Sequence, residues 1–253
     1  MDRRWNRWLF GLLFCGLILW ASVAVAEEAP TGEELLRAVD AALIQAEDMT
    51  ATLELVTTAA SGATEERTLS VWQRGAHQRM VKLTAPARLR GVGLLAKSED
   101  QLYVYLPAFG RVRRVAGQQR GEPFLGSNFT QDDFSRTVFS GRFVASLTED
   151  GDEAAVLELR ARESDEEAYP RMVMEVRKED LQLVRLEFFR DGEEEPRRRL
   201  TFSEYRTVDG QPVAHQVVAE DLRSGSRSVA TLSEVEVNTG LAASLFTRRQ
   251  LQR

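Results

Sequence analysis

The sequence predicts a mainly β protein built on an antiparallel sheet of about eleven strands. Apolar and polar residues alternate in many short segments after residue 50, as expected where one face of each strand is buried. Turn-forming dipeptides such as Asp150-Gly151 and Asp209-Gly210 separate these segments, which favours hairpin connections. Strong helical periodicity occurs in one segment, near the N-terminus.

The first 26 residues have the pattern of a secretory signal peptide. Three arginines precede an apolar run from Leu9 to Trp20, and Ala24-Val25-Ala26 forms an A-x-A cleavage site. The alternative is an uncleaved membrane anchor, but the run is shorter than the roughly 20 residues that span a bilayer. Cys15 lies inside the run rather than at its end, so the pattern is not that of a lipoprotein. We therefore expect residues 27–253 to form a single exported domain.

The exported chain is acidic and contains no cysteine. Loss of the leader removes three of 33 basic and one of 39 acidic residues, which leaves a net charge of −8 and argues against nucleic-acid binding. Cys15 is the single cysteine, so the exported domain has no disulfide. Its apolar core must therefore stabilise the fold without cross-links.

A helix is expected from Thr31 to about Glu47. Thr31 and Glu34 have the spacing of a capping box, and apolar residues follow at helical spacing. The strands are expected around Leu53 and Leu55, Leu69 and Val71, Val81 and Leu83, Leu102, Val104 and Leu106, Met172, Met174 and Val176, Val184, Leu186 and Phe188, Leu200 and Phe202, and Val235 and Val237.

A single helix cannot cover the apolar faces of about eleven strands. A sheet of this width tends to curl. Either two sheets pack as a sandwich, or one sheet curls into a barrel or half-barrel. A half-barrel needs a cover across its mouth, and the N-terminal helix and residues 121–134 are the candidates.

The exported chain resembles a known family over essentially its whole length, and the resemblance is most specific in residues 102–134. The segments LYVYLPAFGRVRRV, from Leu102, and PFLGSNFTQDDF, from Pro123, are similar to the outer-membrane lipoprotein-sorting proteins of Gram-negative bacteria, in the LolA/LolB-like superfamily. The resemblance implies a half-barrel of about eleven strands, with a short helical lid over an apolar cavity.

The same resemblance implies a function in outer-membrane biogenesis. The protein would be a monomeric, non-enzymatic periplasmic carrier that binds the acyl chains of a lipoprotein or a lipid and delivers them toward the outer membrane. An inner-membrane transporter would be a further partner. The alternative is a non-enzymatic periplasmic adaptor or sensor module for an envelope transporter.

Apolar residues of the strands and of the cover are the candidate ligand-binding residues. A cavity wall and a dry core have the same sequence pattern, so a dry core is the alternative at each strand position. Glycines at 121 and 126 are candidate hinges for the cover. The predicted ligand-binding residues are Leu55, Leu83, Val104, Leu106, Phe124, Leu125, Phe129, Met172, Met174, Val184, Phe188 and Phe202.

Two adjacent acids, Asp132 and Asp133, are the candidates for acid–base chemistry. Adjacent residues on a helix point in different directions, however. We expect instead that Ser127 or Asn128 caps a short helix and that both acids lie in its first turns. With two histidines and no cysteine after the leader, residues for a zinc site or a catalytic triad are lacking, so we predict no enzyme, cofactor or metal.

A basic cluster precedes the expected cover. Arg111, Arg113 and Arg114, followed by Arg120, have two interpretations that the sequence leaves open. They dock an acidic partner or lipid phosphates, or their charge protects an edge strand from aggregation. Arg111, Arg113 and Arg114 are the predicted partner-docking residues.

Overall fold

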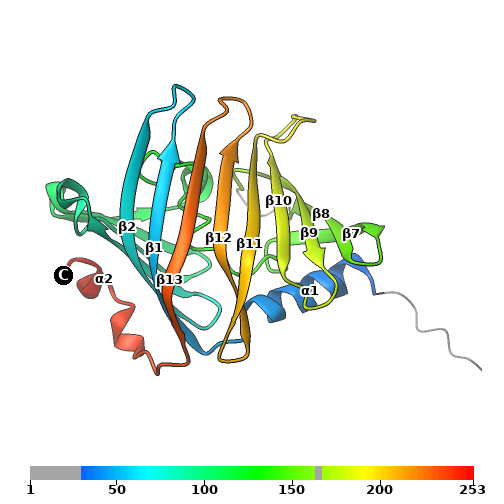
Figure 1. Ribbon diagram of the computed structural model, residues 1–253, viewed down its shortest axis with the longest axis horizontal. Coiled ribbons are helices and arrows are strands. Elements are labelled where there is room, and N and C mark those ends of the chain that lie inside the picture. Colours follow the sequence, from blue (N-terminus) through cyan, green and yellow to red (C-terminus); the bar gives the residue numbers. More distant parts are fainter. Residues whose placement is uncertain (1–29, 163–166) are drawn as a thin grey trace, which may run out of the picture.

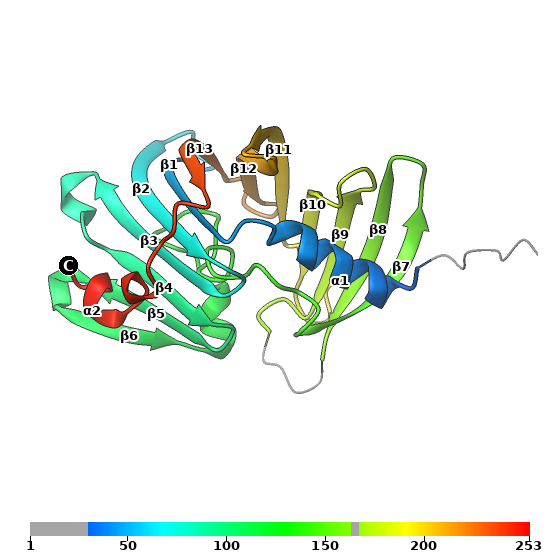
Figure 2. The ribbon, with the colours of Figure 1, turned by 90° about the horizontal axis from the view of Figure 1, so that it is seen from below.

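The computed structural model describes residues 30–162 and 167–253, and the predicted signal peptide lies outside them. Its main element is one antiparallel sheet of thirteen strands that curls around a concave face (Figures 1 and 2). The strands are β1 (Asp48–Thr58), β2 (Thr64–Arg74), β3 (Gln78–Ala85), β4 (Gly93–Ser98), β5 (Gln101–Leu106), β6 (Arg111–Val115), β7 (Phe143–Asp150), β8 (Ala154–Ala161), β9 (Arg171–Arg177), β10 (Leu183–Phe189), β11 (Arg198–Val208), β12 (Gln211–Asp221) and β13 (Arg227–Val237).

Two helices and four short 3-10 turns complete the described chain. The α-helices are α1 (Gly32–Leu43) and α2 (Arg248–Leu251), and the 3-10 turns are η1 (Ala87–Leu89), η2 (Pro107–Phe109), η3 (Gly117–Gly121) and η4 (Ala243–Leu245). None of the helices in residues 30–162 and 167–253 is long and apolar enough to cross a membrane.

The strand order explains how the chain covers its own sheet. The order is β6-β5-β4-β3-β2-β1-β13-β12-β11-β10-β9-β8-β7, so β1 to β6 run outward to one edge and β7 to β13 return from the other. β6 and β7 are consecutive in the sequence but lie at opposite edges. Residues 116–142, which connect them, therefore pass from one edge to the other, and we call them the crossing segment.

The predicted half-barrel is confirmed, with thirteen strands instead of about eleven. All eight groups of alternating residues lie in strands. One strand without such a pattern is β4, in which four consecutive residues are buried. Leu94 packs into the main core on one face of β4, and Leu95 packs against Phe246 of the C-terminal segment on the other, so both faces are apolar.

The N-terminal helix forms as predicted but is shorter. Thr31 and Glu34 form the capping box, and α1 ends at Leu43 rather than near Glu47. Leu36 and Val39 are fully buried. Gly32 touches β7 so closely that a Cβ atom there would lie 2.6 Å from the carbonyl oxygen of Ala145. The helix thus lies along the part of the sheet near β7 (Figure 2).

The expected helix after Ser127 or Asn128 does not form. Residues 122–134 instead consist of turns and bends, with one isolated bridge between Pro123 and Thr130. The backbone is left-handed at Leu125 and Gly126, with φ of 54° and 76°, as in a turn that precedes Ser127. The helical part of the cover is η3, which immediately precedes this stretch.

Candidate ligand-binding cavity

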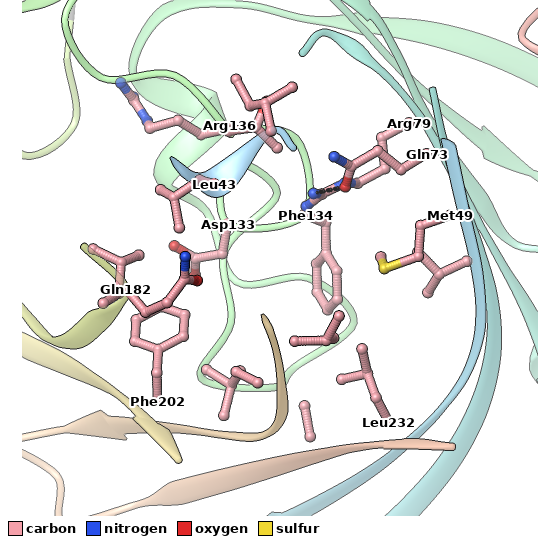
Figure 3. Close-up of a pocket in the computed structure, with 18 of the residues that line it drawn as sticks. Leu43, Met49, Gln73, Arg79, Asp133, Phe134, Arg136, Gln182, Phe202 and Leu232 are labelled. Carbon is pink, nitrogen blue, oxygen red and sulfur yellow. Dashed lines mark hydrogen bonds between the residues drawn. The ribbon is translucent and has the colours of Figure 1, made fainter. Parts of the chain in front are cut away.

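A cavity of about 300 Å³ lies between the concave face of the sheet and the crossing segment (Figure 3). The end of α1 and the linker that follows it, residues 42–49, form a third side. The apolar lining of the sheet comes mainly from β1 and from β10 to β13. These lining residues include Leu53, Leu183, Leu186, Phe188, Leu200, Phe202, Val217, Ala230 and Leu232.

Four phenylalanines place the crossing segment against the sheet. Phe124, Phe129, Phe134 and Phe139 occur at intervals of five residues, and each is at most 6% exposed. The ring centroid of Phe134 lies 5.1 Å from that of Phe124 and 5.6 Å from that of Phe129. Phe129, Phe134 and Phe139 line the cavity. Phe134 and Phe139 were not among the predicted ligand-binding residues, although the five-residue spacing of the four phenylalanines could have identified them.

Polar contacts tie the same segment to the sheet. The Nη2 atom of Arg67 in β2 donates to the carbonyl oxygen of Leu125 at 2.8 Å. The side-chain Nδ2 of Asn128 donates to Ser226 Oγ at 2.7 Å, and its side-chain Oδ1 accepts from Ser228 Oγ at 2.8 Å. The cover is therefore bonded to both β2 and β13 and to the turn that precedes β13.

Helix α1 and strand β11 also hold the crossing segment. Asp40 of α1 accepts hydrogen bonds from the backbone N–H groups of Phe139, at 2.9 Å, and Ser140, at 2.8 Å. Arg198 of β11 forms a bidentate ion pair with Asp133. Its Nη1 donates to Oδ1 at 3.1 Å, and its Nη2 donates to Oδ2. Displacement of the cover would break these buried contacts in addition to exposing the phenylalanines.

The two candidate hinge glycines have different roles. Gly126 has φ of 76° and open space around it, as suits a turn. A Cβ atom on Gly121 would lie 2.2 Å from the Cβ of Ala168, so this glycine permits a close contact. The packing around Gly121 accounts for that glycine without a hinge.

Asp132 lies in a buried network of charges rather than in the first turn of a helix. Its carboxylate accepts from Nε of Arg120 and from Nε of Arg136, each at 2.8 Å. Arg136 also pairs with Glu167 at 2.6 Å, and Nε of Arg142 lies 3.1 Å from Glu167. Arg120, which the sequence grouped with the basic cluster, belongs to this network.

The network controls the protonation of Asp132. Burial acts to raise the pKa of this carboxyl, but the positive charges of Arg136 and Arg120 and their hydrogen bonds outweigh burial and lower the pKa to about 2. Asp132 and Glu167 together raise the pKa of Arg136 against the effect of burial. Asp132 is thus ionised at neutral pH and is a structural counter-ion, not a proton donor.

Three predicted ligand-binding residues, Phe129, Phe188 and Phe202, line the cavity. The other predicted residues lie in or against the apolar core around it, apart from Val184. Leu55, Leu83, Val104, Phe124, Met172 and Met174 are buried in the core, and Leu106 and Leu125 are half-buried against it.

Val184 lies at an irregularity in strand β10. The pairing of β10 with β9 shifts between Leu183 and Arg185, so Leu183 takes the inward position. Val184 is half-buried and does not line the cavity. A bulge of this kind has no clear signal in the alternation of apolar residues.

The predicted docking arginines lie on β6, which is an edge strand of the sheet. Arg111, Arg113 and Arg114 are exposed. Nη2 of Arg114 donates to the carbonyl oxygen of Asp100 at 3.0 Å. Both interpretations of this cluster, docking and protection of the edge, are compatible with its position.

Within residues 30–162 and 167–253, no group of three or more His, Cys, Asp or Glu side chains is placed to hold a metal ion. His215 is buried, and its Nδ1 lies 3.0 Å from the carbonyl oxygen of Val213.

Known proteins share this architecture. A DUF1329 family protein from Desulfovibrio piger is 23% identical, with a TM-score of 0.79 over 87% of this chain and 97% of that one. A domain named for outer-membrane lipoprotein sorting, from Vibrio parahaemolyticus, is 22% identical, with a TM-score of 0.78 over 88% and 98%. A LolA superfamily protein from Nitrosomonas europaea is 22% identical, with a TM-score of 0.73 over 88% and 100%.

The sequence itself also matches one protein family. No curated protein matches the chain. A family model described as "Uncharacterized protein"-like matches residues 75–253. Because this match includes more than half of the chain, the protein belongs to that family, and its half-barrel is the fold of the LolA superfamily.

Proposed function

We propose that this protein is a non-enzymatic periplasmic carrier that holds the acyl chains of a lipid or lipoprotein during transfer toward the outer membrane. The observation that carries the proposal is the apolar cavity between the half-barrel and the crossing segment. Transfer of a chain out of water is favourable by about 0.8 kcal/mol per CH₂ group, so an apolar wall is the main requirement for such a carrier.

The size of the cavity suggests how cargo is accommodated. Ligand pockets measure roughly 300–1,000 Å³, and this cavity, at about 300 Å³, lies at the lower limit. Cargo with several acyl chains requires more room. Phe129 and Phe134 belong to the crossing segment and line the cavity, so movement of that segment would enlarge the space. We infer that the cover moves when large cargo enters.

Native mass spectrometry of protein isolated from the periplasm without detergent tests the proposal. We expect additional mass that is released as lipid on denaturation, and binding of a fluorescent long-chain fatty acid by the emptied protein. Wild-type protein that carries no lipid and binds no fatty acid would contradict the carrier proposal and favour the adaptor or sensor alternative.

A pair of substitutions in β11 relates lipid retention to the cavity. Phe202 lines the cavity and is half-buried, so Phe202→Glu places a charge in the apolar wall. Thr201 is its neighbour on the strand and points to the other face, which makes Thr201→Glu the matched control. We expect only Phe202→Glu to lose lipid, with both variants folded by circular dichroism. Equal lipid retention in the two folded variants would count against this cavity.

A further inference from the structure

One cation in the cavity wall has no acidic partner. Arg79, near the start of β3, lines the cavity, and its guanidinium donates to the side-chain oxygen of Gln73 on β2 (Figure 3). Within the described chain, no carboxylate lies within ion-pair distance of Arg79. Its Nε atom is buried and has no hydrogen-bond partner. A buried arginine donor in this state is costly unless another group accepts from it.

The acids that line the same cavity are already engaged. Asp48 accepts four hydrogen bonds, of 2.8 to 2.9 Å, from residues 239–241. Asp132 is paired with two arginines and Asp133 with Arg198. None of the three therefore neutralises Arg79. Burial lowers the pKa of Arg79 to about 10, which leaves the guanidinium protonated at neutral pH.

Strand register places this cation at one end of an apolar strip. Gln73 of β2 is paired with Met49 of β1 on one side and with Arg79 of β3 on the other. Side chains on one face of a strand recur every second residue. The next two layers across these three strands are apolar, namely Ala51, Val71 and Val81, followed by Leu53, Leu69 and Leu83.

The opposite wall of the cavity is mainly apolar. In Figure 3, Gln73 and Arg79 lie on one side of the cavity, whereas Phe202 and Leu232 lie on the other. A ligand that satisfies both sides has an acceptor at one end and a hydrocarbon chain at the other.

We propose that the cavity binds a single-chain amphiphile with an anionic head group, a phosphate or a carboxylate, whose oxygen accepts from Arg79. This inference rests on the carrier function proposed above and specifies the head group of the cargo. Arginine suits this role because its planar guanidinium offers several donors to one oxyanion. Gln73 accepts from Nη2 of the guanidinium, so Nη1 and Nε have no acceptor among the described residues.

Three probes of one chain length test the head-group preference. Protein freed of lipid is titrated by calorimetry with 1-myristoyl-lysophosphatidic acid, with myristate and with neutral monomyristoylglycerol, each below its critical micelle concentration. A charge-assisted hydrogen bond corresponds to about a tenfold gain in affinity or more, so one or both anionic probes should bind at least that much more tightly than the neutral probe. The anion that binds more tightly identifies phosphate or carboxylate.

Substitution of Arg79 tests whether this arginine causes the preference for anionic head groups. Arg79→Gln should remove the preference by weakening the anionic probes more than monomyristoylglycerol, whereas Arg79→Lys should keep part of it. Arg74 is exposed on the same hairpin and does not line the cavity, so Arg74→Gln is the matched control and should bind as wild type does. The wild-type comparison needs no variant and remains decisive if Arg79→Gln fails to fold.

The possible outcomes separate this inference from the carrier proposal. Equal binding of anionic and neutral probes by the wild type would overturn the head-group inference and leave the carrier function intact. An undiminished preference in folded Arg79→Gln, or an equal loss for all three probes, would also overturn the role of Arg79. Failure of every probe to bind the wild type would contradict the carrier function itself.

Discussion

Neutralising Asp132 should destabilise the protein in a pH-dependent way. Asp132 lies between Arg120 and Arg136, and its pKa falls from 3.8 to about 2 in the folded state. This difference corresponds to about 2 kcal/mol of folding free energy at neutral pH. Asp132→Asn also leaves the two arginines without this counter-ion, and breaking a buried ion pair costs roughly 3–5 kcal/mol. We therefore expect a loss of at least about 2 kcal/mol at pH 7.

The sign of the pH dependence follows from the lowered pKa. A carboxyl whose folded-state pKa is depressed contributes its full stability above the unfolded pKa, here 3.8, and loses it as the pH falls toward about 2. The stability gap between wild type and Asp132→Asn should therefore be constant from pH 7 to about pH 5 and should narrow from there to pH 2.

Urea unfolding followed by circular dichroism at several pH values measures this gap. Glu122→Gln is the matched control, because Glu122 lies on the same crossing segment and is exposed. It should change stability by less than about 0.5 kcal/mol. A gap that is absent at pH 7, or that stays the same down to pH 2, would refute the role of Asp132 as a buried counter-ion.

Three further predictions concern the leader and the cover. N-terminal sequencing of protein from the periplasm should find Glu27 as the first residue, and a start at any earlier residue would contradict cleavage after residue 26. Gly121→Ala should lower the free energy of unfolding by about 1–3 kcal/mol, because its Cβ would lie 2.2 Å from Ala168 Cβ, and Ala168→Gly in the same chain should restore it. Phe124→Ser and Phe129→Ser should each speed amide exchange in residues 122–134, while β11 to β13 stay protected. If exchange in residues 122–134 stays slow in both variants, these rings do not hold the cover.

The sequence by itself determined the class of fold and most of its elements. Alternation with a period of two placed eight strands correctly, because each of them buries one face and exposes the other to water or to a thin second layer. The capping box of Thr31 and Glu34 located the start of α1, since a cap is a local interaction. The resemblance of residues 102–134 to the LolA/LolB-like superfamily then selected the half-barrel.

The cavity was only partly visible in the sequence. Phe129, Phe188 and Phe202 were expected to line it and do so, while Met172 and Met174 share the same alternation but lie in the core. Which inward residues face empty space depends on the curvature of the sheet and the path of the cover. Arg79 did leave a local signal in the sequence. It is a charged residue two and four positions before Val81 and Leu83, so it lies on the same inward face of the strand.

Only the tertiary structure decided what Asp132, Asp133 and Arg120 do. Their partners are separated from them by up to 65 residues along the chain, as in the pair of Asp133 and Arg198. Considered locally, adjacent acids near glycines favoured a helix start over a catalytic pair and gave no sign of distant arginine partners. The choice follows from the strand order, which places β6 and β7 at opposite edges, and from the four phenylalanines that hold the connecting segment against the concave face. Long-range pairing of this kind determines which charges become buried together, and no local pattern specifies it.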